Sequence, residues 1–177
     1  HLVLNVTVPA VTITWNANGG TAVNATSGKA GNAIGTLPTT TRTGYTFAGW
    51  FTAASGGTQI TTTSTYPTSG NVTYYAHWIA KNYTVTYNAN GGTGAPANQT
   101  ATYDSKFTVS TTQPTRAGYT FNGWKDPTGV SSWTNWSGTW KYDNGQYGIT
   151  NNTLTLTAQW TPKTYTVTYN ANGGTGA

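Results

Sequence analysis

The pentapeptide Asn-Ala-Asn-Gly-Gly decides the fold of this chain, because it occurs three times, at residues 16–20, 88–92 and 170–174. Asn-Gly is the strongest short signal for a tight hairpin turn, since both residues tolerate positive φ. Before each pentapeptide, Thr alternates with larger, mostly apolar residues, at 11–15, 83–87 and 165–169. This period of two predicts a strand that leads into each turn.

Two further motifs follow the first two pentapeptides in the same order. Gly-Tyr-Thr-Phe-x-Gly-Trp occupies residues 44–50 and 118–124, and Ala-x-Trp occupies residues 76–78 and 158–160. Motifs that recur in a fixed order indicate a tandem array of small domains. Arrays of this kind serve reach and binding more often than chemistry, so the repeats favour a structural or binding protein over an enzyme.

Each copy is predicted to be a small, mainly β domain with little helix. Alternating residues indicate closing strands over 72–78 and 154–160, and no window shows convincing helical periodicity. Gly49 and Gly123 lie inside predicted strands and indicate a β-bulge or a close backbone approach. We expect four equivalent aromatic side chains in each core: Tyr45, Phe47, Trp50 and Trp78 in the first copy, and Tyr119, Phe121, Trp124 and Trp160 in the second.

The composition limits the possible functions. Aromatic residues make up 14% of the 177 residues and charged residues only 6%, with no Cys and no Glu. Without Cys the chain has no disulfides or thiolate metal ligands. No two of the eight Lys and Arg residues are adjacent, which argues against nucleic-acid binding. No apolar run of about 18 residues is present, which argues against membrane insertion. A Cys-free chain rich in Thr, Asn and Gly suits a secreted or surface-exposed bacterial protein.

The repeats divide the chain into four predicted parts. Residues 1–8 form an extra N-terminal strand, 9–80 the first repeat domain, 81–163 the second repeat domain, and 164–177 the first strand and turn of a third repeat. The chain begins at His1 without Met, so we expect a mature or excised part of a longer secreted protein.

The second copy contains a Trp-rich insert. The spacing from Trp124 to Trp160 is eight residues longer than the spacing from Trp50 to Trp78, and the extra residues lie within 125–152. Five aromatic residues of the insert are candidates for glycan or partner binding: Trp133, Trp136, Trp140, Tyr142 and Tyr147. Flat aromatic side chains on a surface grip sugar rings at a low entropy cost. The alternative is a small core under a long loop, because exposed apolar patches are costly.

The titratable side chains do not indicate chemistry. The acids are Asp104, Asp126 and Asp143, and the histidines are His1 and His77. Catalysis and metal binding both need such groups to converge. The second copy has Gln159 in place of His77, so we expect His77 to be a solvent-facing strand residue. We therefore predict no enzyme, no cofactor and no metal site.

Arg42 and Arg116 occupy equivalent positions, two residues before the Gly-Tyr pair of each copy. We predict a structural role for both, either by stacking on an aromatic face or by binding loop carbonyls, which would hold the loop onto the sheet.

Two alternating segments near the ends are candidates for strand exchange between molecules. A lone strand leaves one apolar face and its backbone edges unsatisfied, and strand addition can link subunits head to tail. The expected contacts are Leu2, Leu4, Val6, Val8, Tyr165, Val167 and Tyr169. The alternative is a cut piece of a longer array, in which these strands belong to further copies.

Taken together, the motifs resemble the Listeria–Bacteroides repeat, the B-repeat of internalin-B-like surface proteins. The resemblance rests on Tyr-Thr-Val-Thr-Tyr at 83–87, Asn-Gly-Gly at 90–92, Pro-Thr-Arg-Ala-Gly-Tyr-Thr-Phe-Asn-Gly-Trp at 114–124 and Leu-Thr-Ala-Gln-Trp at 156–160, and it also covers residues 11–78. The first copy departs from it with Thr40 in place of Pro114, and the second departs in its insert. The resemblance implies small β-grasp-like domains, strung together on bacterial surface and secreted proteins, without catalytic residues.

The sequence therefore predicts a non-enzymatic repeat module of a bacterial cell-surface or cell-wall protein that acts as a stalk, adhesin or filament building block. Its expected partners are further copies of itself or other surface proteins. The alternative function is a carbohydrate-binding module that binds glycans through the insert.

Overall fold

The computed structural model describes residues 7–175, and every regular element among them is a β-strand. The chain divides into two compact units, one of residues 1–81 and 102–104, the other of residues 82–101 and 105–177. The predicted fold class, mainly β with small tandem domains, is confirmed. Within residues 7–175 there is no helix long and apolar enough to cross a membrane.

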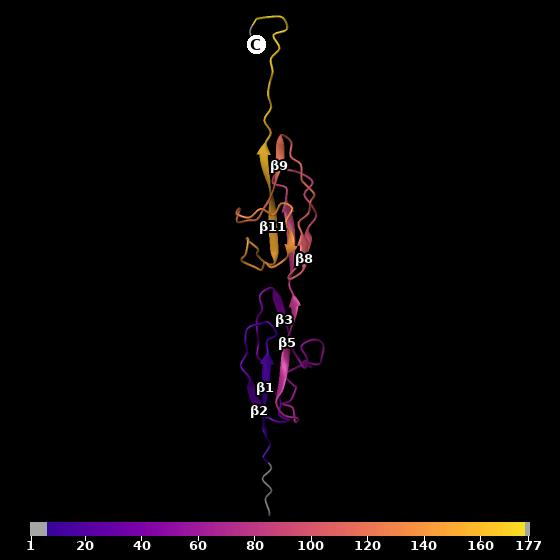
Figure 1. Cartoon of the computed structure of the whole chain (residues 1–177), viewed down its shortest axis with the longest axis vertical. Helices are drawn as coiled ribbons and strands as arrows, with labels where there is room; N and C mark the ends of the chain where they lie inside the picture. Colours follow the sequence, from indigo (N-terminus) through magenta and orange to yellow (C-terminus); the bar gives the residue numbers. More distant parts are fainter. Residues whose placement is uncertain (1–6, 176–177) are drawn as a thin grey trace, which may run out of the picture. The chain divides into compact units, whose positions relative to one another are not determined.

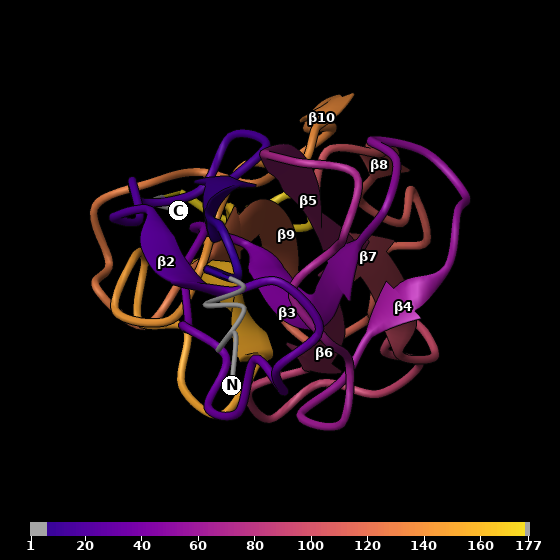
Figure 2. The ribbon, with the colours of Figure 1, turned by 90° about the horizontal axis from the view of Figure 1, so that it is seen from below.

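The first unit is a five-stranded sheet in the order β2-β1-β5-β3-β4. Its strands are β1 (Ala10–Asn16), β2 (Thr26–Lys29), β3 (Tyr45–Phe51), β4 (Gln59–Ile60) and β5 (Val72–Ala80). The first and closing strands, β1 and β5, pair in parallel, whereas the other neighbours are antiparallel. Figure 2 views this sheet from below and shows β2 and β4 at its opposite edges.

The second unit repeats this plan in a four-stranded sheet of order β7-β6-β11-β9, and adds a two-stranded sheet of β10 and β8. Its strands are β6 (Asn82–Asn88), β7 (Gln99–Thr102), β8 (Lys106–Thr108), β9 (Tyr119–Lys125), β10 (Ser137–Thr139) and β11 (Thr153–Pro162). Again the first and closing strands, β6 and β11, are parallel neighbours, and β11 lies beside β9 (Figure 1).

A β-bulge interrupts the antiparallel pair in both units, as the glycines predicted. The register of β3 against β5 shifts between Phe47 and Gly49, and the register of β9 against β11 shifts opposite Gln159. Gly49 has a φ of 125° and Gly123 a φ of 103°. Residues with a side chain rarely adopt such a positive φ, so glycine is required here. The bulge directs the next residue, Trp50 or Trp124, into the core.

The cores contain the predicted tryptophans and the alternating strand residues. Trp50 and Trp124 are 0% and 2% exposed. Around them lie the inward residues of the first and closing strands, which are Val11, Ile13, Trp15, Tyr74 and Ala76 in the first unit and Tyr83, Val85, Leu154, Leu156 and Ala158 in the second. Phe47 and Trp78 pack against the first core but are only partly buried.

The prediction that Tyr45 and Tyr119 are core residues is wrong. Both side chains are half-buried and lie beneath the guanidinium groups of Arg42 and Arg116. Each Tyr begins its strand, where the sheet ends, so its ring packs against the preceding loop instead of the centre of the sheet.

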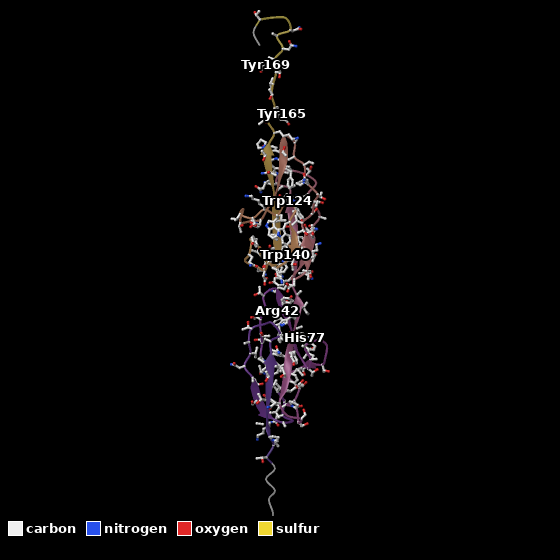
Figure 3. All side chains as sticks on the ribbon, viewed as in Figure 1. Arg42, His77, Trp124, Trp140, Tyr165 and Tyr169 are labelled. Atoms are coloured by element: carbon white, nitrogen blue, oxygen red, sulfur yellow. The ribbon has the colours of Figure 1, made fainter. Side chains whose placement is uncertain are left out.

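The segment after β11 does not form the predicted strand within the described chain. Tyr165, Val167 and Tyr169 are 75%, 70% and 76% exposed, and Figure 3 shows both tyrosines on a segment that runs away from the second sheet. The pentapeptide turn nevertheless forms, since the Asn172 amide donates to Asn170 Oδ1 at 2.9 Å.

The predicted N-terminal strand can be followed only in part. Leu2, Leu4 and Val6 lie outside the described residues, while Val8 is 49% exposed and belongs to no strand.

Candidate functional site

The pentapeptide turn of each unit is fastened to the closing strand of the same unit. In the first unit the Asn18 side-chain amide donates to the Ala76 carbonyl at 3.0 Å, and the Trp78 indole donates to the Ala17 carbonyl at 3.0 Å. In the second unit the same two bonds recur at the same distances, from Asn90 to Ala158 and from Trp160 to Ala89. These bonds explain why both motifs recur together. We call this arrangement the clasp.

An arginine completes each clasp, and its structural role was predicted correctly. Arg42 Nη1 donates to the Asn18 carbonyl at 3.4 Å, and its guanidinium carbon lies 4.0 Å from the centre of the Tyr45 ring. Arg116 repeats both distances against Asn90 and Tyr119. Each arginine thus ties the loop before its strand to the turn, with its charge spread over an aromatic face.

The Trp-rich insert of the second unit contains both a small core and an open hollow. Trp133 and Trp140 are 2% and 0% exposed, and Figure 3 shows Trp140 within the unit. Trp136, Tyr142 and Tyr147 are half-buried. The two buried rings therefore agree with the small-core interpretation, and the other three leave part of their surface to solvent.

The half-buried rings line a hollow of about 330 Å³ together with Ser131, Ser132 and Trp133. The ring centres of Tyr142 and Tyr147 are 4.9 Å apart at 78°, and those of Trp136 and Tyr142 are 5.8 Å apart at 54°. The walls of the hollow are therefore inclined to one another and do not form one flat platform.

Backbone hydrogen bonds hold the insert in place. The Trp133 amide donates to the Trp124 carbonyl at 3.0 Å, and the Trp136 carbonyl accepts from Val109 at 2.9 Å. Strand β10 pairs with β8 immediately after Trp136. The insert is thus anchored to β9 and to the small sheet of β8 and β10.

A buried carboxylate fixes the floor of the hollow. Asp126 is 3% exposed, and its Oδ2 accepts from the Trp133 indole at 3.0 Å. Its Oδ1 accepts from the Thr128 amide at 2.9 Å and from the Thr128 hydroxyl. Burial raises the pKa of Asp126, but the hydrogen bonds from Thr128, Trp133 and Gly129 outweigh it and leave the pKa below its ordinary value. The carboxylate is therefore charged near neutral pH.

The phenol of Tyr142 stays neutral across the physiological range. Burial raises its pKa, the neighbouring Tyr147 adds to the rise, and a hydrogen bond from the Trp136 side chain offsets part of it. The hydroxyl can consequently both donate and accept a hydrogen bond at the wall of the hollow.

Two other titratable side chains, His77 and Asp143, have structural partners. His77, predicted to face solvent, is half-buried: its Nε2 lies 2.9 Å from the Ala53 carbonyl and its ring stacks on Phe51 at 3.9 Å. Asp143 accepts from the Tyr83 hydroxyl at 2.8 Å. Between residues 7 and 175 no three His, Cys, Asp or Glu side chains gather to form a metal site.

Sequence reasoning missed Asp126 and the two serines of the hollow. The Asp-Pro-Thr-Gly sequence at 126–129 did contain a signal, since Asp before such a turn commonly accepts from the backbone two residues on. Ser131 and Ser132 carried no signal, because their place in the hollow depends on how the insert folds back onto β9.

Comparison with known proteins identifies the repeats. The family model of the Listeria-Bacteroides repeat domain matches residues 12–77 and 83–159. Internalin H of Listeria monocytogenes is 33% identical over 75% of this chain and 24% of its own length. A putative Gly-rich membrane protein of Evansella cellulosilytica is 28% identical over 92% of this chain and 18% of its own. The chain thus spans about a fifth of the length of these relatives.

Proposed function

The chain belongs to the Listeria–Bacteroides repeat domain family, and from this premise we propose that it is a non-enzymatic stalk module of a bacterial surface protein that carries tension. The observation behind this proposal is that the first and closing strands of each unit are parallel neighbours at the centre of the sheet. In this arrangement the chain enters a unit at one end of the central pair and leaves it at the other.

The second unit illustrates the geometry. Thr84 lies opposite Thr153 and Asn88 opposite Thr157, so β6 begins before the pair and β11 continues beyond it. A pull on the two ends of the unit would slide β6 along β11. The evenly spaced hydrogen bonds of a parallel ladder would then bear the force together instead of opening one after another.

The clasp strengthens the same pair of strands. The bond from Asn90 to the Ala158 carbonyl and the bond from Trp160 to the Ala89 carbonyl both join the end of β6 to β11. The Thr86 hydroxyl also donates to Thr155 Oγ1 at 3.0 Å. Only Lys81 separates β5 from β6. So short a connection suits a stalk, because a long flexible linker would extend under load before the modules bear the force.

A location outside the bacterial cell is part of the proposal. The relatives' names, which include an internalin and a membrane protein, support it, as does the lack of Cys in a chain rich in Thr and Gly. The function of a whole stalk or adhesin would involve segments beyond this chain, since the chain spans about a fifth of those relatives.

Force spectroscopy on single molecules tests the stalk function. The chain has no Cys, so an introduced pair gives unique attachment points. Attachment at Asn82→Cys and Pro162→Cys pulls β6 along β11, whereas attachment at Asn88→Cys and Thr157→Cys pulls an opposed pair apart sideways. We expect the first pair to need a clearly higher unfolding force. Equal forces for the two attachments would refute the tension-bearing role.

Filament assembly by strand exchange is a second candidate, favoured by the exposed side chains of Tyr165, Val167 and Tyr169. Their equivalents Tyr83 and Val85 are 1% and 0% exposed against the closing strand. Sedimentation over a range of concentrations would show assembly that Val167→Asp abolishes. A chain that stays monomeric throughout that range would exclude this candidate.

A further inference from the structure

The hollow of the insert is not needed by the repeat fold. The first unit builds the same central strands, the same bulge and the same clasp without an equivalent insert. To these shared features the second unit adds a two-stranded sheet and a cluster of aromatic side chains that contact one another. Trp133 pairs with Trp124 as Ile60 pairs with Trp50, but the walls of the hollow, Trp136, Tyr142 and Tyr147, lie outside the features that the two units share.

The hollow is also preorganised. Its floor ring, Trp133, is 2% exposed and bonded to the buried carboxylate of Asp126. One wall ring, Trp136, is fixed by backbone bonds to Trp133 and Val109 on either side. A site held in this way loses little conformational freedom when a ligand enters, which lowers the entropic cost of binding.

The lining of the hollow is neutral. Its six residues are Ser131, Ser132, Trp133, Trp136, Tyr142 and Tyr147, and none is Asp, Glu, His, Lys or Arg. The nearby carboxylate of Asp126 already accepts hydrogen bonds with both oxygens, from Thr128 and from Trp133. A charged ligand would therefore find no counterion among the lining residues, and burying an unpaired charge is expensive.

The chemistry of the lining points to a ligand with both apolar and hydroxyl faces. The aromatic walls offer flat apolar surface, and the two serines and two tyrosines offer hydroxyls that donate and accept. A hollow of about 330 Å³ falls at the small end of ligand sites. An extended peptide would need a groove or a free strand edge, whereas a compact hollow suits a single ring.

We propose that this hollow binds one neutral pyranose ring of a glycan, with Trp136, Tyr142 and Tyr147 against the ring and Ser131 and Ser132 at its hydroxyls. This goes beyond the stalk function and does not depend on it, because a stalk without sugar binding would still bear tension. It would give one module of an array a contact with carbohydrate.

The test is a titration of the full chain with methyl glycosides of glucose, galactose, mannose and N-acetylglucosamine, followed by the indole N–H signals in NMR spectra. We expect at least one glycoside to shift the Trp136 signal. Trp136→Ala should weaken its binding by about tenfold or more, as loss of an aromatic anchor does. Tyr147→Phe keeps the ring, removes one hydroxyl, and should weaken binding by a smaller factor.

Tyr165→Ala is the matched control, because it removes an aromatic side chain that is 75% exposed and outside the hollow. Its affinity should equal that of the unaltered chain. Tyr147→Phe keeps the test decisive if Trp136→Ala disturbs the insert. The proposal is overturned if no neutral glycoside binds, if both hollow variants bind as well as the control, or if only acidic sugars or proline-rich peptides bind.

Discussion

At the scale of single residues, Asp126 shows how one buried charge organises an insert. It is one of three acids in the chain, it is almost fully buried, and both of its oxygens accept hydrogen bonds. One carboxylate oxygen accepts from Thr128 in the turn, and the other accepts from the Trp133 indole. Because the donors are fixed by the backbone and by a packed ring, a carboxylate fits this position and its amide does not.

The change Asp126→Asn tests this account. One face of the new amide would accept from Thr128, but its NH₂ would then point at the Trp133 indole N–H, which is also a donor. We expect a loss of about 1–3 kcal/mol in the free energy of unfolding, the range for losing a hydrogen bond to a buried charged group. Urea unfolding monitored by Trp fluorescence measures it. A loss below about 0.5 kcal/mol would contradict the role of Asp126.

The pH dependence gives an independent check on the same carboxylate. The pKa of Asp126 is lower in the folded chain than its ordinary value. Its stabilising contribution is therefore complete above the ordinary aspartate range and is lost as the pH falls through that range towards the folded pKa. Between neutral pH and about pH 2, the unaltered chain should lose more stability than Asp126→Asn. Parallel losses in the two proteins would show that this carboxylate does not contribute.

A glycine of the turn makes a second prediction at this scale. A Cβ on Gly92 would lie 2.6 Å from the Trp160 ring and 2.7 Å from the Thr115 carbonyl oxygen, and the carbonyl cannot easily move. We expect Gly92→Ala to cost about 3 kcal/mol, the upper part of the range for overpacking. Thermal unfolding followed by circular dichroism measures the change.

Gly94 is the control for this prediction. It has a φ of 74°, and a Cβ there would meet nothing within 4 Å. Gly94→Ala should therefore cost only the strain of the left-handed conformation, about 1 kcal/mol. If Gly94→Ala is as destabilising as Gly92→Ala, the close approach of Trp160 is not what requires glycine at position 92.

At the scale of elements, the turn and the closing strand act as one piece. Trp160 joins them through its bond to the Ala89 carbonyl, and its ring packs against Phe121 at 5.7 Å. Trp160→Phe keeps most of the packing and removes the indole donor, while the Ala89 carbonyl still accepts from the Gly92 amide. We therefore expect a loss of about 1 kcal/mol, the typical net value of one hydrogen bond. Trp160→Ala also loses the packing and should cost about 3 kcal/mol, the lower end for a Trp because the ring is half-buried.

Hydrogen exchange of the β6 and β11 amides measures these losses within the second unit. Tyr165→Ala again serves as the control and should change stability by less than about 0.5 kcal/mol. If both Trp160 variants exchange like the unaltered chain, the clasp does not stabilise the sheet.

The sequence predicted the turns, the bulges and the strands β1, β3, β5, β6, β9 and β11 because their signals are local. The alternation before Asn-Gly-Gly, and the glycine before Trp50 or Trp124, are each set by a few neighbouring residues. Tyr45 was misplaced because alternation alone does not show where a sheet ends. The shape of the insert was not predictable, since the hollow exists only because Trp133 folds back onto β9 and β10 pairs with β8.

At the scale of the whole molecule, the repeat behaves as a unit that is complete only when its first and closing strands are both present. Residues 165–174 are identical in sequence to residues 83–92, and they form the same turn. What they lack within the described residues is a closing strand to pair with and a Trp to donate to the carbonyl of Ala171. Their exposed side chains follow from this difference in partners.

Extending the chain tests whether a closing strand is sufficient. We would append a copy of residues 96–163 after Ala177, so that Tyr165, Val167 and Tyr169 precede a full set of repeat motifs. The central pairing of β6 with β11 should then recur in the added copy, and the amides of residues 165–169 should become as protected from hydrogen exchange as those of residues 83–87. The same extension with the Trp equivalent to Trp160 changed to Ala is the control, and it should protect them less. Exchange at residues 165–169 that stays as fast as in the shorter chain would contradict the idea that each repeat closes on its own first strand.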